Sequence, residues 1–176
     1  MLYFAYGSNL SIARLQQRVP SSRLVATGRL RRHSLVFHKI GRDGSAKCNA
    51  YYTGNPEDYT LGAVYSIAPS HKPLLDKAEG LGNGYEIKHV TVMTDTGAEF
   101  SPFLYSATEI DRHRKPFHWY KEHVLRGMRE HGFPAQYLSR AAAVESIADN
   151  DSARTERELQ IYSQDISINF LTGGGF

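Results

Sequence analysis

Short apolar runs separated by turn residues fill the first two-thirds of the chain and predict β-strands. The first run covers residues 2–6. A longer run over residues 24–38 contains Gly28 and arginine-rich positions, where we expect a bend or bulge between two strand halves. Two further strands are predicted over residues 46–53 and 61–67, because turn residues lie between them.

The spacing of apolar residues becomes helical in other stretches of the chain. Ser11 is suited to cap the first helix, and Gly80 is suited to end the second. Pro134 favours the start of a later helix. The predicted helices cover residues 12–18, 69–79, 117–130, 134–144 and 154–159.

Residues 85–94 and 99–105 flank the turn sequence Asp-Thr-Gly and predict a hairpin. Six or seven strands joined mostly by short turns favour an α+β fold, a small, mainly antiparallel (mixed) β-barrel with flanking helices. We expect one domain over residues 1–150 and a tail, partly helical or flexible, over residues 151–176.

The composition is that of a soluble globular protein, with 41% hydrophobic and 22% charged residues among 176. No apolar run approaches the roughly 20 residues of a membrane span, and the N-terminus lacks a signal peptide. Cys48 is the single cysteine, which favours a reducing cytoplasm. The net charge of +3 and the basic clusters at residues 29–32 and 112–115 lack the motifs of nucleic-acid binding. We therefore expect neither a nucleic-acid nor a membrane partner, and a monomer or homodimer.

Two familiar kinds of site are not supported. His113, His118 and His123 recur every five residues, which scatters them around a helix instead of placing them together on a metal ion. The glycine-rich residues 80–84 follow a helix and precede a strand, the reverse of a dinucleotide-binding loop. We expect no metal and no cofactor.

The sequence Tyr-Gly-Ser-Asn at residues 6–9 lies where a strand is followed by a helix. Gly7 lets the backbone turn, so that the next N–H groups can point outward together and bind a carboxylate or a developing oxyanion. The same residues also suit a plain turn, in which Ser8 and Asn9 bond the local backbone.

Glu79 is the last predicted residue of its helix, at the negative end of the helix dipole. That position disfavours the charged carboxylate and would raise its pKa, as suits a group that transfers protons. The alternative is an exposed glutamate without a role. Other acids, such as Asp76, are interpreted as ordinary solvated side chains.

Together these features resemble the γ-glutamylcyclotransferase family. Residues 4–10, Phe-Ala-Tyr-Gly-Ser-Asn-Leu, resemble its signature opening, and residues 75–81, Leu-Asp-Lys-Ala-Glu-Gly-Leu, resemble the segment with its catalytic glutamate. Residues 61–65 look like its preceding strand, and residues 119–137 look like its C-terminal helical pair. The resemblance extends over residues 1–145.

The resemblance implies a small β-barrel enzyme without a cofactor, acting on a small γ-glutamyl amide. The substrate's α-amine would attack its own γ-carbonyl to form 5-oxoproline and release an amine, with Glu79 as general acid and base. Tyr85 is a further candidate for contact with the substrate. The residues that the resemblance assigns to substrate binding are Tyr3, Phe4, Ala5, Tyr6, Gly7, Ser8, Asn9, Tyr105 and Tyr120.

The leaving amine stays open, because members of the family act on γ-glutamyl amino acids, γ-glutamyl-lysine-type amines or γ-glutamyl protecting groups. Specificity is expected in the loops at residues 41–47 and 106–115. Residues 110–115 depart from the family pattern because they are strongly basic, and the tail from residue 152 has no counterpart in it. We expect both to border the leaving-group side or the surface. A hydrolase of a small amide and a non-catalytic binding module are the alternatives.

Overall fold

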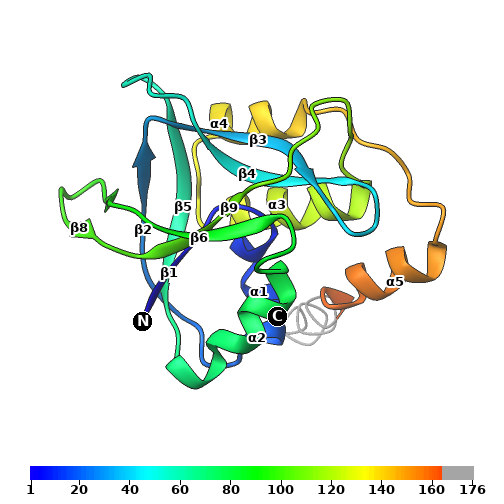
Figure 1. Ribbon diagram of the computed structural model, residues 1–176, viewed down its shortest axis with the longest axis horizontal. Coiled ribbons are helices and arrows are strands. Elements are labelled where there is room, and N and C mark those ends of the chain that lie inside the picture. The colour runs from blue at the N-terminus through cyan, green and yellow to red at the C-terminus, as the bar shows by residue number, and fades with distance from the viewer. Residues whose placement is uncertain (164–176) are drawn as a thin grey trace, which may run out of the picture.

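The computed structural model describes residues 1–163 and contains a seven-stranded sheet in the order β6-β9-β1-β5-β2-β7-β8. The sheet curls into a half-barrel, and a separate two-stranded hairpin, β3-β4, lies across its open side (Figure 1). Within the described residues every strand pairing is antiparallel except that of β1 with β9. The fold is therefore α+β with a curled mixed sheet, as the sequence predicts. The strands are β1 (Leu2–Ala5), β2 (Arg23–Arg31), β3 (His33–Ile40), β4 (Ala46–Tyr52), β5 (Tyr59–Ser66), β6 (Tyr85–His89), β7 (Val92–Met93), β8 (Glu99–Phe100) and β9 (Phe103–Ala107).

The helices lie at the ends and on one side of this sheet, with α1 and α2 close to each other and α5 at the edge of the molecule (Figure 1). α3 contacts the short 3-10 helix Ser8–Leu10, α4 and α5, so it connects the first turn of the chain to the C-terminal part. The helices are α1 (Ile12–Arg18), α2 (Lys72–Glu79), α3 (His118–Glu130), α4 (Ala135–Ala142) and α5 (Ser152–Gln160).

The bend expected in the long second apolar run is present at one of its arginines, Arg32, and not at Gly28. Arg32 has a φ of 60° between β2 and β3, whereas Gly28 is inside β2. A Cβ at Gly28 would lie 2.6 Å from Cγ1 of Val92. The glycine is therefore needed for the close approach of β7, not for a bend.

The predicted hairpin of residues 85–105 divides into four strands that pair in a different way. β6 pairs with β9, while β7 pairs with β8 and with β2. The chain thus turns from one part of the sheet to another between His89 and Val92, and again at Pro102. This division explains why the described residues 1–163 contain nine strands, where six or seven were expected.

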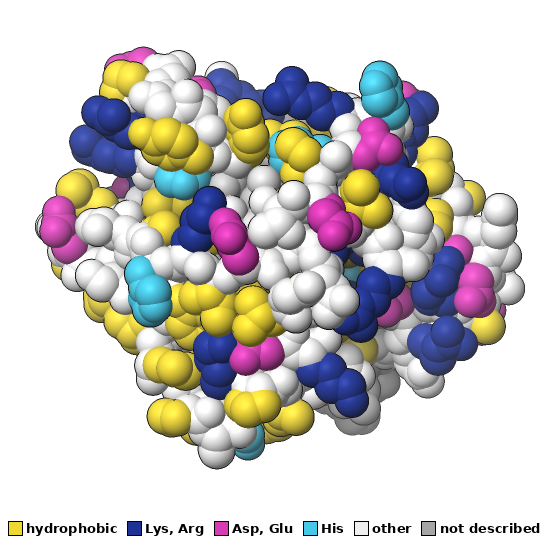
Figure 2. Space-filling view, viewed as in Figure 1, with side chains coloured by type: hydrophobic (Ala, Val, Ile, Leu, Met, Phe, Trp, Pro, Cys, Tyr) yellow, Lys and Arg dark blue, Asp and Glu magenta, His cyan; other side chains and the backbone are white. Residues whose placement is uncertain are grey.

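The core contains aromatic and aliphatic side chains from both the sheet and α3. Phe4, Val64 and Met128 are fully buried within it. Within residues 1–163, no helix combines the length and apolar character that crossing a membrane requires. Lys and Arg side chains are interspersed with Asp and Glu over the face shown in Figure 2, without one continuous basic band.

Candidate active site

Glu79 ends α2, and Gly80 follows it in the left-handed conformation with a φ of 74°. This helix end brings the Glu79 side chain against the first turn of the chain, although 70 residues separate Glu79 from Asn9. The Glu79 side chain is 16% exposed. It is therefore enclosed but reachable, as a proton-transfer group must be.

One oxygen of Glu79 is held and the other is free. Asn9 Nδ2 donates to Oε1 of Glu79 at 2.8 Å, and Nη1 of Arg18 donates to the same oxygen at 3.2 Å. Arg18 also donates to Oδ1 of Asn9 at 2.8 Å, which fixes the orientation of the amide. Within the described residues no donor reaches Oε2 of Glu79. The carboxylate is thus oriented by two neighbours and keeps one oxygen for a ligand.

The first turn presents backbone donors beside this carboxylate. The 3-10 helix Ser8–Leu10 begins there, and the N–H groups of Gly7, Ser8 and Asn9 donate to no acceptor among residues 1–163. Gly7 is tightly enclosed, since a Cβ on it would lie 2.9 Å from Cβ of Cys48. The turn therefore approaches β4 closely and has free N–H groups that suit a carboxylate or an oxyanion.

Five buried tyrosines surround the same space, and burial raises the pKa of each hydroxyl, so all are neutral near pH 7. The hydroxyl of Tyr6 donates to the carbonyl of Tyr105, and that of Tyr85 donates to the carbonyl of Cys48 at 2.6 Å. Tyr120 is different because its hydroxyl oxygen accepts the Cys48 N–H at 2.9 Å. Its hydrogen has no nitrogen or oxygen acceptor among the described residues and can donate to a ligand.

Asp76 is not an ordinary solvated acid. Its Oδ1 accepts a hydrogen bond from the Tyr105 hydroxyl at 2.6 Å, and Lys72 donates to the same carboxylate. Tyr105 comes from β9 and Asp76 comes from α2, so this contact ties the helix that carries Glu79 to the sheet.

Two adjoining hollows meet at Glu79. The inner hollow is narrow, about 20 Å³, and Glu79 is the one acidic or basic side chain among the residues that line it. The outer hollow is larger, about 220 Å³, and open to solvent. Ser8, Glu79, Tyr85 and Tyr120 line both and form a shared wall. The inner hollow is lined by Tyr3, Tyr6, Gly7, Ser8, Asn9, Cys48, Glu79, Tyr85, Tyr105 and Tyr120. The charged residues of the outer hollow are Arg14, Arg18, Lys39, Arg42, Asp43, Lys47, Glu79 and Glu158.

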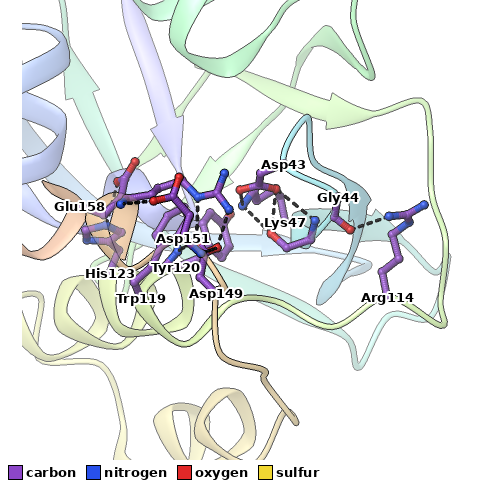
Figure 3. Close-up of polar contacts among 12 residues, drawn as sticks. Asp43, Gly44, Lys47, Arg114, Trp119, Tyr120, His123, Asp149, Asp151 and Glu158 are labelled. Atoms are coloured by element: carbon purple, nitrogen blue, oxygen red, sulfur yellow. Dashed lines mark hydrogen bonds and ion pairs between the residues drawn. The ribbon is translucent and has the colours of Figure 1, made fainter. Parts of the chain in front are cut away.

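The predicted tail contributes to the outer hollow through α5. Glu158 pairs with Arg14, which also donates to Nε2 of His123 at 2.9 Å. Figure 3 shows Glu158 and His123 at one side of this region, and Asp43 and Lys47 at the other. Burial lowers the pKa of His123 to about 4, so this imidazole is neutral near pH 7. Nδ1 of His123 lies 2.6 Å from the Tyr162 hydroxyl. Tyr162 follows α5 closely, so the hydrogen bonds of Arg14, His123 and Glu158 connect this helix to the rest of the protein.

Known proteins resemble this chain in sequence. The profile of the AIG2-like family matches residues 59–140. The human protein named γ-glutamylcyclotransferase is 31% identical over 151 residues, covering 82% of this chain and 78% of that protein. A mouse protein of the same name is 31% identical over 148 residues with the same coverage. The chain belongs to the γ-glutamylcyclotransferase family. As a member of this family it is an enzyme.

The γ-glutamylcyclotransferase fold extends over nearly all of the chain. A solved structure named γ-glutamyl cyclotransferase superposes with a TM-score of 0.81 at 27% identity, covering 91% of this chain and 98% of that one. A human protein whose structure was solved without an assigned function superposes with a TM-score of 0.80 at 28% identity, covering 90% and 97%. The resemblance stated from residues 4–10 and 75–81 is thereby confirmed.

The structure brings most of the predicted site residues together. Tyr3, Tyr6–Asn9, Tyr105 and Tyr120 line the inner hollow with Glu79. Phe4 and Ala5 do not line either hollow, because both side chains are fully buried in the core. Their place in β1 positions the turn that follows. The basic residues 110–115 also lie outside both hollows; Arg114, for example, donates to the carbonyl of Gly44.

Several residues at the site were missed by sequence reasoning. Arg18 orients Glu79, and Lys39 and Glu158 line the outer hollow. Asn9 was predicted to contact the substrate, and its side chain also orients Glu79. Helical spacing placed Arg18 at the end of the predicted first helix, but no local signal indicates contact with a residue 61 positions away. Within residues 1–163, no three His, Cys, Asp or Glu side chains gather into a candidate metal site.

Proposed function

We propose that this enzyme cyclises the γ-glutamyl group of a small amide into 5-oxoproline and releases the amine. The observation that carries the proposal is the Glu79 carboxylate, which faces the donor-rich first turn with Oε1 held and Oε2 free. Ring closure is intramolecular, so the protein mainly has to hold a folded substrate and move protons.

The proposed reaction begins when Oε2 of Glu79 takes a proton from the substrate's α-ammonium group. The amine nitrogen then attacks the γ-carbonyl carbon, and a carbon–nitrogen bond forms as the carbonyl oxygen becomes an oxyanion. This oxyanion breaks the original amide bond when it collapses, and Glu79 returns the proton to the leaving nitrogen. The attacking nitrogen then gives its second surplus proton to the Glu79 carboxylate, which passes it to the released amine. The lactam therefore keeps one N–H, the amine leaves as an ammonium ion, and Glu79 is again ionised. No water is consumed, and the products are 5-oxoproline and an amine.

The two hollows suit the two parts of such a substrate. In our proposal the glutamyl part extends towards the inner hollow, and the leaving amine extends into the outer hollow. Because the inner hollow measures about 20 Å³, the γ-carbonyl would lie at the shared wall instead of deep inside. There the free N–H groups of residues 7–9 and the Tyr120 hydroxyl are the donors for its oxyanion.

A hydrolase on the same scaffold is the second candidate. In that mechanism Glu79 would activate water, and the products would be glutamate and the amine. Glu79 alone is compatible with both mechanisms, but cyclisation needs no additional nucleophile. We also propose that the enzyme works in the cytoplasm, since Cys48 is its single cysteine and is buried as a free thiol.

The test is mass detection of the products from γ-glutamyl-alanine. The wild type should release 5-oxoproline and alanine, and Glu79→Gln should lower kcat/KM by about 10²–10⁴-fold, because glutamine keeps the Asn9 contact but cannot exchange a proton. Glu86→Gln is the matched control, since Glu86 is exposed on β6 away from both hollows. Release of free glutamate would support the hydrolase, and release of neither product would support a binding module.

A further inference from the structure

The outer hollow contains more positive than negative side chains, and their pairing is uneven. Three of its cations have carboxylate partners in the same hollow: Arg14 with Glu158, Arg18 with Glu79, and Lys47 with Asp43. The Lys47–Asp43 pair, at 2.7 Å, is drawn in Figure 3. Lys39 and Arg42 also line the hollow, but neither has a carboxylate within 4 Å among residues 1–163.

Lys39 is the more unusual of these two cations because it is only 4% exposed. Its Nζ donates no hydrogen bond to a described residue, and it lies 4.6 Å from the centre of the Tyr85 ring on the shared wall. Nζ is nevertheless not among the fully buried polar atoms that lack a partner, so the stem of Lys39 is buried while its ammonium group reaches the outer hollow and is available to a ligand. Burial also lowers the pKa of Lys39, while the carboxylates of Glu79 and Glu109 counteract this effect.

The backbone turns Lys39 towards the hollow. The pairing of β3 with β4 shifts register between Phe37 and Lys39, which is a β-bulge. A one-residue shift moves a side chain to the opposite face of a strand, and bulges are common where a side chain must point into a site. His38 and Lys39 are consequently both buried in succession, contrary to the alternation of a regular strand.

We propose that Lys39 is a specificity-determining residue, whose ammonium group binds a carboxylate carried by the leaving amine. This inference rests on the proposed function, and it assigns to Lys39 the recognition of an acidic group on the amine portion of the substrate. Lys39 supplies the charge at the junction with the inner hollow. Arg42 is exposed in the turn between β3 and β4 and lines the same outer hollow, so it should attract the carboxylate more weakly than Lys39 does.

The experiment compares γ-glutamyl-alanine with γ-glutamyl-ethylamide, which differs only by the absence of the carboxylate. The wild type should have a higher kcat/KM for γ-glutamyl-alanine. Lys39→Met should lower that kcat/KM by about 10- to 100-fold and change the value for the ethylamide by less than about twofold. Arg42→Met should lower the γ-glutamyl-alanine value by about two- to fivefold.

Lys77→Met is the matched control, because Lys77 is an exposed lysine on α2 outside both hollows. It should leave both substrates unchanged. Turnover of the ethylamide by Lys39→Met shows that this variant is folded. If Lys39→Met does not fold, product inhibition of the wild type tests whether the leaving-group site binds a carboxylate. Alanine should then inhibit more strongly than ethylamine.

Three results would overturn the inference. Equal losses on both substrates would mean that Lys39 acts on the glutamyl part or on the chemistry. Unchanged kinetics in Lys39→Met, or equal inhibition by alanine and ethylamine, would mean that no carboxylate is bound there. Failure of the proposed function is distinct, because then neither substrate yields 5-oxoproline with the wild type.

Discussion

The inner and outer hollows share one wall but are built from different chemistry. The inner hollow has neutral tyrosines and free backbone donors, whose positions are fixed by strands, by the first turn and by close contacts such as Gly7 with Cys48. The outer hollow has long charged side chains from a hairpin, α1 and α5. Rigid neutral groups suit transition-state stabilisation, whereas charged groups on longer side chains suit recognition of a variable leaving group.

This difference predicts that substitutions in the inner hollow impair turnover on every substrate, and that substitutions in the outer hollow change which substrate is preferred. The predictions below test the two hollows separately, beginning with the largest expected effect.

Gly7→Ala should reduce kcat/KM by about 100-fold on all substrates. The new Cβ would lie 2.9 Å from Cβ of Cys48, so the turn and its N–H groups must move, and small displacements at a reacting centre have effects of this size. Steady-state kinetics on γ-glutamyl-alanine and γ-glutamyl-ethylamide are the measurement. Gly97→Ala is the control, because Gly97 has a positive φ in an open turn and its substitution should lower stability by about 1 kcal/mol without loss of activity. A Gly7→Ala enzyme with normal turnover would contradict the role of the turn.

His123, beside the outer hollow, should make the stability of the protein depend on pH. Its pKa is about 4 in the folded protein and 6.5 when exposed, so the unfolded chain binds the extra proton first as the pH falls. The stabilisation present above pH 6.5 should therefore be lost between pH 6.5 and 4, with a magnitude of about 3 kcal/mol. Denaturant unfolding at several pH values measures this change.

His123→Gln should reduce the pH dependence in that window and leave the part due to other histidines whose pKa burial lowers, such as His38 and His131, while His113→Gln, at an exposed position, should leave it unchanged. Glu158 also stabilises the folded protein, but over a lower pH range. Its pKa falls from 4.5 to about 2 on folding, so the stabilisation it provides is lost only as the pH falls below about 4.5. An unaltered slope in His123→Gln would show that this imidazole is not the titrating group.

Tyr120→Phe should lower kcat/KM by about tenfold, whichever amine leaves. The substitution removes a hydroxyl that accepts the Cys48 N–H at 2.9 Å and can donate to the substrate. Tyr137→Phe is matched, because the Tyr137 hydroxyl accepts the Leu61 N–H at 3.0 Å but lies outside both hollows. Both variants should lose about 1 kcal/mol of stability, and only Tyr120→Phe should lose activity. Equal activities would show that the Tyr120 hydroxyl serves structure alone.

The thiol of Cys48 should contribute least to the activity of the enzyme. Burial raises its pKa to about 12, so the thiolate that reacts with alkylating reagents is scarce at neutral pH. Incubation of the folded enzyme with iodoacetamide at pH 7.5 should leave activity unchanged, while the unfolded chain should be labelled. Rapid inactivation of the folded enzyme with labelling of Cys48 would contradict this assignment.

Helix bounds that depend on neighbouring residues were predicted well from the sequence. The first helix has the predicted bounds of Ile12–Arg18, and the Glu79–Gly80 end of α2 matches the expected helix stop. The bend between β2 and β3 lies at Arg32 and not at Gly28, because a glycine marks close approach as well as a bend, and only the position of β7 distinguishes these cases. Ser11 was expected to cap α1, but its side chain makes no capping bond and accepts from Tyr162 instead.

The site was predictable only in part, for a related reason. The first turn and Glu79 have recognisable neighbours in sequence, so each could be proposed separately. The contacts of Glu79 with Arg18 and Asn9 join residues 61 and 70 positions apart, and no local pattern encodes such a distance. Lys39 was also missed, because the bulge that turns it inward depends on the register of β3 against β4.

The most direct test of the account is a crystal structure of Glu79→Gln with γ-glutamyl-alanine bound. We predict that the substrate's γ-carbonyl lies at the shared wall within hydrogen-bond distance of the first turn, with its α-amine next to residue 79 and the alanine carboxylate towards Lys39. A substrate bound in the opposite direction, or a γ-carbonyl outside both hollows, would contradict the account.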